Sequence, residues 1–330
     1  MKKILITGAN GNIGSYITDK ARHLLPQTEL ITTIYSPEDK SPSNGVYAGD
    51  LRDPAFVNRI FQDHPDIDCI IHAAASSYNT DKFKAQPFDI FKDDTLCLLN
   101  VLENSPATKK KIILLSSVMV YESVSGIPFT EVMSDKNPAP ITPYGLAKFL
   151  GERAVQLYCE QNNCDFTIWR LFNVISPLED HTRPGAHVYV DFYRKLFIER
   201  IKEMEIFGDG RQVRCFTWVE DIADAVIKYL NDPRTSQQTI NLGGNEPKTL
   251  IELFETLLAV GKKNGLLPQD YLPMAKTGKT FSGLDVGQRI PSLEKIQELL
   301  DWKAPTNFYT MLEKFIAEKQ HYVDRSLPTV

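Results

Sequence analysis

The sequence predicts an α/β fold, a doubly wound parallel sheet with a smaller C-terminal lobe. Short apolar runs alternate with amphipathic runs through the first half of the chain, which is the order that builds a parallel sheet covered by helices. A glycine-rich turn directly follows the first apolar run, and sheets of this kind bind ligands at the carboxyl ends of their strands. The length of 330 residues is enough for one large domain and a smaller lobe.

In the first half of the chain, short apolar runs fit strands and amphipathic runs fit helices. We expect strands at Lys3–Thr7, Leu30–Tyr35, Val46–Ala48, Cys69–His72, Ile112–Ser116 and Phe166–Leu171. The helices between them are expected at Ile13–Leu25, Pro54–Gln62, Asp89–Glu103 and Tyr144–Gln161.

In the second half the alternation is looser. We expect a polar loop at Pro177–Gly185 and a helix at Asp191–Glu203. Two further strands, Phe216–Val219 and Thr239–Leu242, are expected to return to the sheet domain, and Asp221 is expected to cap the helix between them. Three more helices are expected at Leu250–Lys262, Leu293–Leu300 and Tyr309–Gln320.

The glycine-rich turn is Thr7-Gly8-Ala9-Asn10-Gly11-Asn12-Ile13-Gly14, and it lies between the first strand and a helix. Glycine lets the backbone approach a phosphate closely, and a helix N-terminus offers unpaired N–H groups and a positive dipole end. The spacing Gly-x-x-Gly-x-x-Gly differs from the common G-x-G-x-x-G dinucleotide fingerprint. A tight turn alone would also explain three glycines, but this position in the chain favours a nucleotide site.

A second motif, Tyr144-Gly145-Leu146-Ala147-Lys148, places a phenol and an ammonium one helical turn apart on the same face. Upstream, Ser116-Ser117 ends a buried apolar run. A free tyrosine has a pKa near 10, and a nearby ammonium lowers it by favouring the phenolate. A serine hydroxyl can bind the same substrate oxygen and orient it. Each residue alone has an ordinary structural explanation, but Ser117, Tyr144 and Lys148 together predict an acid/base catalytic unit.

With these motifs the chain resembles the extended short-chain dehydrogenase/reductase family, in its branch of nucleotide-sugar epimerases, dehydratases and reductases. The three glycines match the family's T-G-x-x-G-x-x-G turn, and the Ser-Tyr-Lys unit matches its catalytic residues. The resemblance covers nearly the whole chain. It implies an enzyme with a Rossmann-type NAD(P)-binding domain, residues 1–173 plus 216–245, and a substrate-binding lobe, residues 174–215 plus 246–330.

The resemblance also implies a cofactor site. Asp50-Leu51 match the pair that borders the adenine in the family, and the segment from His72 to Ala75 matches the one along the cofactor ribose. The implied cofactor-binding residues are Gly8, Asn10, Gly11, Asn12, Ile13, Gly14, Ser36, Asp50, Leu51, Ala73, Ala74, Ala75, Tyr144 and Lys148.

Three residues match family positions that bind the substrate. Asn173 lies in the segment where substrate binding begins, Arg214 matches an arginine that touches the substrate's nucleotide, and Arg289 matches one that neutralises its diphosphate. Guanidinium groups bind phosphate oxygens through paired, charge-assisted hydrogen bonds. Ion pairs within the protein are the alternative, namely Arg214 with Asp209 or Glu220, and Arg289 with Asp285.

The chain departs from the family pattern after Ser117. Sugar dehydratases of the family typically carry Asp-Glu there and decarboxylases a Glu, whereas this chain has Val118 and Met119, which cannot transfer a proton. Glu122 stands where a glycine usually follows Tyr121. The remaining chemistry needs only the Ser-Tyr-Lys unit: oxidation and re-reduction at a sugar carbon, or a simple keto/alcohol conversion.

The end of the second strand bears on the choice between NAD and NADP. A carboxylate there usually holds the ribose 2′-hydroxyl, and an arginine accommodates a 2′-phosphate. Ile34-Tyr35-Ser36-Pro37 offers neither, and Lys40 fits an exposed loop. We expect NAD as the cofactor, with NADP as the open alternative.

Composition agrees with an ordinary soluble enzyme. The net charge of −5 argues against a nucleic-acid partner. The sequence shows no signal peptide and no apolar run of 18 residues, so we expect no membrane insertion. The five cysteines lack the spacing of a metal site, so we expect no metal and a cytoplasmic location with reduced thiols.

The sequence leaves three functions open, and it predicts a homodimer. The first function is an NAD-dependent nucleotide-sugar epimerase, the second a nucleotide-4-keto-sugar reductase, and the third a non-catalytic dinucleotide-binding sensor or scaffold. The intact Ser-Tyr-Lys unit argues against the third. The resemblance also implies a homodimer through the helices at Asp89–Glu103 and Tyr144–Gln161, because both carry apolar residues beyond what one sheet face needs.

Overall fold

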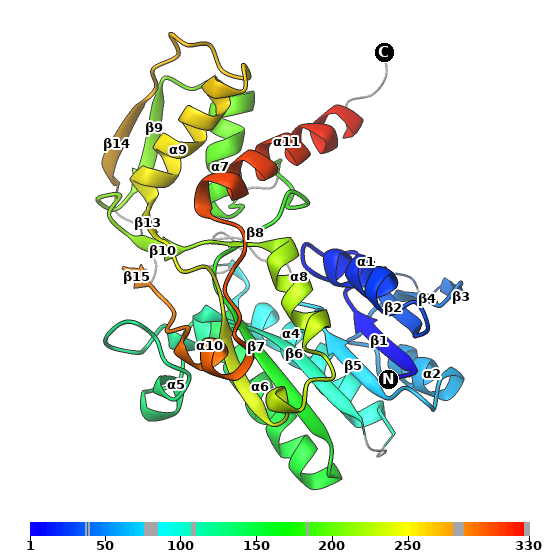
Figure 1. Cartoon of the computed structure of the whole chain (residues 1–330). Helices are drawn as coiled ribbons and strands as arrows, with labels where there is room; N and C mark the ends of the chain where they lie inside the picture. The colour runs from blue at the N-terminus through cyan, green and yellow to red at the C-terminus, as the bar shows by residue number, and fades with distance from the viewer. Residues whose placement is uncertain are drawn as a thin grey trace.

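The structure is a computed structural model that describes residues 1–36, 38, 40–75, 85–106, 110–182, 185–279 and 287–326. Its centre is an eight-stranded sheet in the order β12-β7-β6-β5-β1-β2-β4-β3 (Figure 1). Neighbouring strands of this sheet run parallel, except that β3 pairs antiparallel with β4 at the edge. The predicted doubly wound sheet is confirmed.

The strands of the large sheet are β1 (Lys3–Thr7), β2 (Glu29–Tyr35), β3 (Lys40–Ser43), β4 (Val46–Gly49), β5 (Cys69–His72), β6 (Lys111–Ser117), β7 (Asp165–Leu171) and β12 (Gln238–Leu242). The helices that flank it are α1 (Gly14–Leu24), α2 (Pro54–Asp63), α4 (Pro87–Asn104), α6 (Pro143–Asn162), α8 (Val219–Lys228) and α10 (Glu294–Leu300). Shorter helical turns are η1 (Val118–Tyr121), α5 (Met133–Lys136) and η3 (Pro233–Thr235).

Successive residues of a strand point to opposite faces, and helices cover both faces of this sheet. On one face Ile4 and Ile6 pack in a cluster with residues of α1, α8 and α10. On the other, Leu5 packs in a cluster with residues of α2 and α4. Burial on both faces explains why the strands are nearly continuous apolar runs.

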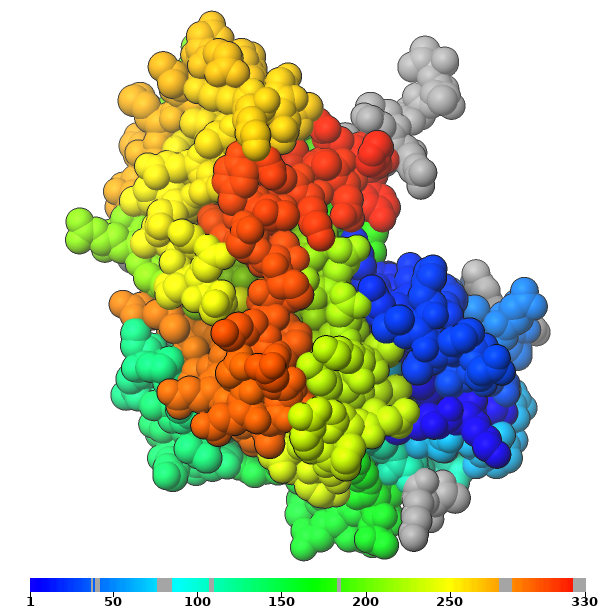
Figure 2. Space-filling view, in the orientation of Figure 1, coloured from blue at the N-terminus to red at the C-terminus, as the bar shows by residue number. Residues whose placement is uncertain are grey.

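A second apolar core lies outside the sheet, among α7 (Val188–Tyr193), α9 (Leu250–Lys263) and α11 (Phe308–Ser326). In Figure 1 these helices lie above the large sheet, and Figure 2 shows most of the yellow-to-red part of the chain gathered in the upper part of this face. Small sheets with the orders β13-β10-β15, β11-β8 and β14-β9 accompany this core. Their strands are β8 (Val174–Ile175), β9 (Glu203–Phe207), β10 (Val213–Cys215), β11 (Thr217–Trp218), β13 (Pro247–Thr249), β14 (Met274–Lys279) and β15 (Gln288–Arg289).

Of the expectations for the second half, the N-cap at Asp221 was wrong. Thr239–Leu242 does join the large sheet, but Phe216–Val219 does not, because β11 pairs with β8 in a separate two-stranded sheet. Asp221 is not the N-cap of α8, which begins at Val219. The carboxylate of Asp221 accepts hydrogen bonds from the N–H of Thr306 at 3.0 Å and from the hydroxyl of Thr306 at 2.8 Å. Asp221 therefore binds a loop far along the chain instead of capping α8.

The helix expected at Asp191–Glu203 is shorter, since α7 and the π-helical turn η2 (Arg194–Ile198) are followed by β9. In β9 the buried residues Met204 and Ile206 alternate with exposed ones, which is a strand pattern.

The division into two lobes stays a prediction. Ile296 and Leu300, which it assigns to the second lobe, pack in a cluster of the large sheet. In the part of the chain that the structure describes, the helices are too short or too polar to cross a membrane.

Candidate active site

The glycine turn lies against the end of β5. Gly8 has a φ of +67°, and a Cβ on it would lie 2.8 Å from Cα of Ala74. A Cβ on Gly14 would lie 2.1 Å from the carbonyl oxygen of Gly8. The structure thus brings Gly8 and Ala74 of the implied cofactor site together, and both glycines are required for this close approach.

Helix α1 begins at Gly14, and its N-cap residue Ile13 provides no side-chain hydrogen bond to its first turn. The first turn of α1 also carries no acidic residue, so its positive dipole end is not balanced there. The Oγ of Ser176 donates to the carbonyl oxygen of Asn12 at 3.0 Å. Next to Ser176, the buried Lys319 of α11 donates to the carbonyl oxygen of Pro177 at 2.9 Å.

The ends of β2 and β4 carry the next implied cofactor residues. Ser36 is buried, and its N–H donates to the carbonyl oxygen of Gly49 at 3.1 Å. Asp50 pairs with Arg52 at 2.5 Å, and the same guanidinium pairs with Asp93 of α4 at 2.9 Å. Hydrogen bonding to Arg52 lowers the pKa of Asp50. Sequence reasoning missed Arg52, although its position two residues after a candidate carboxylate was a signal.

The Ser-Tyr-Lys unit lies where β6 ends and α6 begins. Ser117 is the last residue of β6, and its Oγ accepts a hydrogen bond from the N–H of Met119 at 3.2 Å. Tyr144 is the second residue of α6. The ammonium of Lys148 lies 5.5 Å from the centre of the Tyr144 ring and donates to the carbonyl oxygen of Leu115 at 3.4 Å. Lys148 therefore links the phenol to the strand that ends in Ser117.

His72 lies beside this unit at the end of β5. Its Nδ1 is 3.1 Å from Oγ1 of Thr7, and its side chain is buried. Burial and the charge of Lys148 lower the pKa of His72 to about 3. The ring is therefore neutral at physiological pH and adds no second cation next to Lys148.

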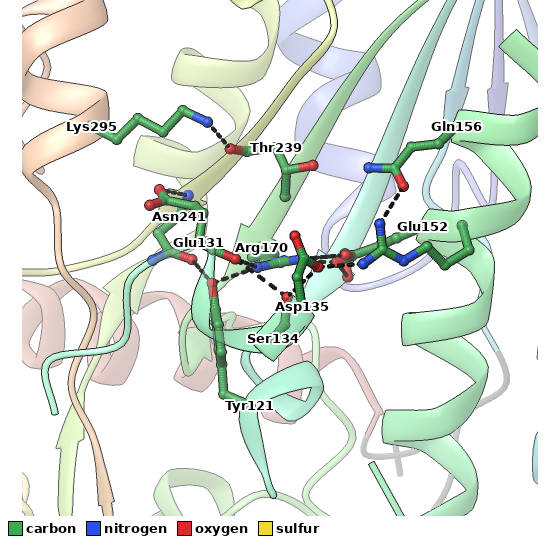
Figure 3. A network of polar contacts seen from close by, with 12 residues as sticks. Tyr121, Glu131, Ser134, Asp135, Glu152, Gln156, Arg170, Thr239, Asn241 and Lys295 are labelled. Atoms are coloured by element: carbon green, nitrogen blue, oxygen red, sulfur yellow. Dashed lines mark hydrogen bonds and ion pairs between the residues drawn. The ribbon is translucent and has the colours of Figure 1, made fainter. Parts of the chain in front are cut away.

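A buried polar network lies next to the Ser-Tyr-Lys unit. Figure 3 shows the side chains of Tyr121 and Glu152 pointing toward Arg170. Arg170 of β7 forms an ion pair with Glu152 of α6 at 2.6 Å and donates to the Tyr121 hydroxyl at 2.8 Å. Glu152 also accepts a hydrogen bond from Ser116 at 2.5 Å. Arg170 begins the sequence segment that ends in Asn173, but its guanidinium is buried in this network. It holds α6, which carries Tyr144 and Lys148, against β7 and the end of β6, which carries Ser117.

The structure brings the two candidate phosphate-binding arginines together. Arg214 of β10 and Arg289 of β15 are register partners in adjacent parallel strands, so their side chains leave the sheet on the same face. Asn173 lies next to this pair, because its Nδ2 donates to the carbonyl oxygen of Cys215 at 3.1 Å.

Two of the carboxylates considered as alternative partners of the arginines, those of Asp209 and Glu220, have other contacts. The carboxylate of Asp209 accepts the N–H of Arg211 at 2.9 Å. That of Glu220 accepts from Nε1 of Trp218 at 2.9 Å and lies 3.4 Å from Lys314. Asp285, the alternative partner of Arg289, lies outside the described residues.

Comparisons with known proteins identify the family of this chain. The family model described as "NAD dependent epimerase/dehydratase family" matches residues 4–243. A UDP-glucose 4-epimerase of Streptococcus mutans serotype c is 29% identical over 333 residues, which cover 95% of this chain and 94% of that protein. UDP-glucuronic acid decarboxylase 1 of Danio rerio is 23% identical over 92% of this chain and 69% of its own length.

Among solved structures, the UDP-glucose 4-epimerase of Thermotoga maritima with UDP-glucose has a TM-score of 0.80 at 24% identity, covering 97% of this chain and 99% of that one. The Thermus thermophilus UDP-glucose 4-epimerase in complex with NAD has a TM-score of 0.79 at 22% identity, covering 96% and 99%. At these identities the likeness establishes a common fold. The family model covers well over half of the residues, and so the chain belongs to the NAD-dependent epimerase/dehydratase family, a family of enzymes.

Proposed function

We propose that this enzyme is a nucleotide-sugar 4-epimerase that uses NAD. The observation that carries the proposal is the pairing of Tyr144 with Lys148, whose ammonium lies 5.5 Å from the phenol ring at the carboxyl end of the sheet. The similarity to UDP-glucose 4-epimerases over nearly the whole chain supports the reaction type.

The residues of the glycine turn fit NAD. The positive φ of Gly8 and the close approach of Gly14 to the carbonyl oxygen of Gly8 close the turn tightly at the start of α1, whose first N–H groups are proposed to hold the pyrophosphate. Asn10, Gly11, Asn12 and Ile13 complete this turn, and Ser36, Asp50, Leu51 and Ala73 to Ala75 are the proposed contacts of the adenosine and ribose parts. When bound, NAD oxidises the sugar and reduces it again by accepting and returning a hydride.

We assign the proton transfer to Tyr144. Its phenolate takes the proton of the sugar hydroxyl at the carbon that is oxidised and returns it on reduction. Lys148 favours the phenolate by its charge, and Ser117 holds the same sugar oxygen by a hydrogen bond. The next residues, Val118 and Met119, carry no acid or base, which favours epimerisation over the dehydration and decarboxylation found elsewhere in the family.

We further propose that Arg214 and Arg289 hold the diphosphate of the substrate, with Asn173 next to them. Two guanidinium groups on register partners of adjacent strands can bind the same anion through charge-assisted hydrogen bonds. A uridine diphosphate sugar is the substrate class that the relatives suggest.

The test is conversion of a panel of UDP-hexoses by the purified protein without added cofactor. We expect interconversion of two C4 epimers, with nucleotide that co-purifies and no net change in absorbance near 340 nm. Turnover only with added NADH or NADPH, one equivalent per product, would instead identify a 4-keto-sugar reductase. Binding of NAD without turnover of any nucleotide sugar would favour a sensor or scaffold.

We also propose a homodimer through α4 and α6. These helices pack against each other and leave Leu96, Leu150 and Leu157 with 37%, 41% and 65% of their surfaces exposed. Their neighbours Leu98, Val101 and Val155 are buried, so the exposed leucines are in excess of what the sheet face needs.

A further inference from the structure

Glu122 departs from the family pattern, and the structure places its side chain at the start of α6. One carboxylate oxygen, Oε1, accepts hydrogen bonds from the N–H groups of Ile141 and Thr142, each at 2.5 Å. The other, Oε2, accepts the hydroxyl of Thr142. A glutamate on an ordinary solvent-facing loop does not bind three donors from a segment about twenty residues further along the chain.

These contacts hold the first turn of α6 against η1. Thr142 is the N-cap of α6, and its Oγ1 accepts the N–H of Gly145 at 3.1 Å. A Cβ on Gly145 would lie 2.7 Å from Oε2 of Glu122 and 2.8 Å from the carbonyl oxygen of Met119. Since Ser117 is the N-cap of η1, the two short segments that carry Ser117 and Tyr144 are in direct contact.

Tyr144 and Lys148 are anchored differently. Lys148 donates to Leu115 of β6, and one turn further along α6 Glu152 binds Ser116 and Arg170, so this part of the helix is held independently of Glu122. Tyr144 lies in the first turn, between the residues that Glu122 binds and Gly145. The position of the phenol relative to the ammonium therefore depends on the contacts of Glu122.

We propose that Glu122 is a positioning residue for the reaction: it fixes the start of α6 so that the Tyr144 phenol stays in register with Lys148 and Ser117. This inference rests on the proposed function. It does not assign a proton transfer to Glu122, because the carboxylate is occupied by three donors from residues 141 and 142.

The experiment compares Glu122→Ala, Glu122→Gln and wild-type enzyme. We expect Glu122→Ala to lower kcat at least fivefold, with KM for the nucleotide sugar and the affinity for NAD little changed. Glu122→Gln keeps an acceptor for the two N–H groups and restores most of the activity, which an acid/base glutamate would not do.

Hydrogen exchange gives a readout that needs no substrate: the amides of residues 141, 142 and 144–146 exchange faster in Glu122→Ala than in the wild type. The control is Asp232→Ala, which removes the N-cap of η3, whose Oδ1 accepts the N–H of Arg234 at 3.0 Å. This control loses a cap outside the proposed site and keeps wild-type kcat.

An active wild type with equally active Glu122→Ala, or a kcat loss in Glu122→Ala without faster exchange of these amides, overturns the positioning role alone. Equal inactivity of Glu122→Gln and Glu122→Ala also overturns it. A wild-type enzyme that converts no nucleotide sugar overturns the proposed function, and with it the inference that rests on it.

Discussion

The Tyr144 side chain differs from phenylalanine only by the hydroxyl that the proposed mechanism uses. We expect Tyr144→Phe to lower kcat by about 100-fold or more, because the ring stays in place while the proton acceptor is lost. Affinity for NAD should change little. The comparison is Tyr309→Phe, which removes a partly exposed hydroxyl on α11 and should leave kcat unchanged. Tyr144→Phe with more than about a tenth of wild-type kcat contradicts the assignment.

Arg214 and Arg289 are neighbours across two strands, and both are proposed to bind the substrate diphosphate. Replacing each with Met should raise KM for the nucleotide sugar at least about tenfold, or roughly 1.4 kcal/mol of binding free energy. The affinity for NAD should stay the same. Arg22→Met, on the exposed surface of α1, is the control. Unchanged sugar-nucleotide binding in both variants would show that the substrate has no diphosphate at this place.

His72 makes the stability of the fold sensitive to acid. Its pKa is about 3 in the folded protein and about 6.5 in the unfolded chain, so between these values the unfolded chain binds more protons. This contribution is complete above pH 6.5 and is lost as the pH falls toward 3. At pH 5 the loss is about 2 kcal/mol. Urea unfolding at pH 7 and pH 5 should show a smaller pH effect in His72→Asn than in the wild type; equal effects contradict this.

Spacing along the chain decided which contacts of the site could be predicted. The proximity of Tyr144 and Lys148 follows from helix geometry at four residues apart. The pairing of Arg214 with Arg289 needed the fold, because β10 and β15 are far apart in sequence. Glu122 could be recognised as unusual, but its partners Ile141 and Thr142 belong to a loop whose path no local pattern fixes. The roles assigned to these residues remain predictions.

At the scale of elements, the turn between β1 and α1 depends on both a backbone conformation and a close contact. Gly8 and Gly265 have nearly the same φ, +67° and +70°, but only Gly8 has another backbone within 3 Å of where a Cβ would lie. We expect Gly265→Ala to cost about 1 kcal/mol of stability without affecting NAD binding. Gly8→Ala should in addition lower NAD affinity more than tenfold, measured by calorimetry. Equal NAD affinity in the two variants contradicts the proposed role of the glycine turn in binding NAD.

The strands of the large sheet were predicted closely, and those of the second half less so. β1 and β5 match the predicted bounds, because strands buried on both faces are short, continuous apolar runs. β3 at the exposed edge was missed, and β8 and β11 are two-residue strands whose pairing depends on tertiary contacts. Asp221 has the residue type of an N-cap, but its bonds to Thr306 come from a segment that no local pattern connects to it.

For the whole molecule, the face formed by α4 and α6 is the surface expected to pair with a second copy. Leu157→Asp places a charge in the middle of this apolar surface and should convert a dimer to a monomer, as measured by light scattering. Leu272→Asp is the control, because Leu272 is 76% exposed but lies outside these helices. A wild-type protein that is already monomeric at micromolar concentration contradicts the proposed dimer.

The contact between Ser176 and Asn12 has a consequence for the order in which the site is completed during synthesis. The glycine turn leaves the ribosome before the rest of the sheet, and chains begin to fold from their N-terminal parts. However, one of its contacts comes from residue 176, and the adjoining Pro177 is bound by Lys319 of the last described helix. The large sheet likewise lacks its edge strand β12 until residue 242 has been made. A nascent chain therefore carries the glycine turn long before it carries the residues that hold that turn in its final place.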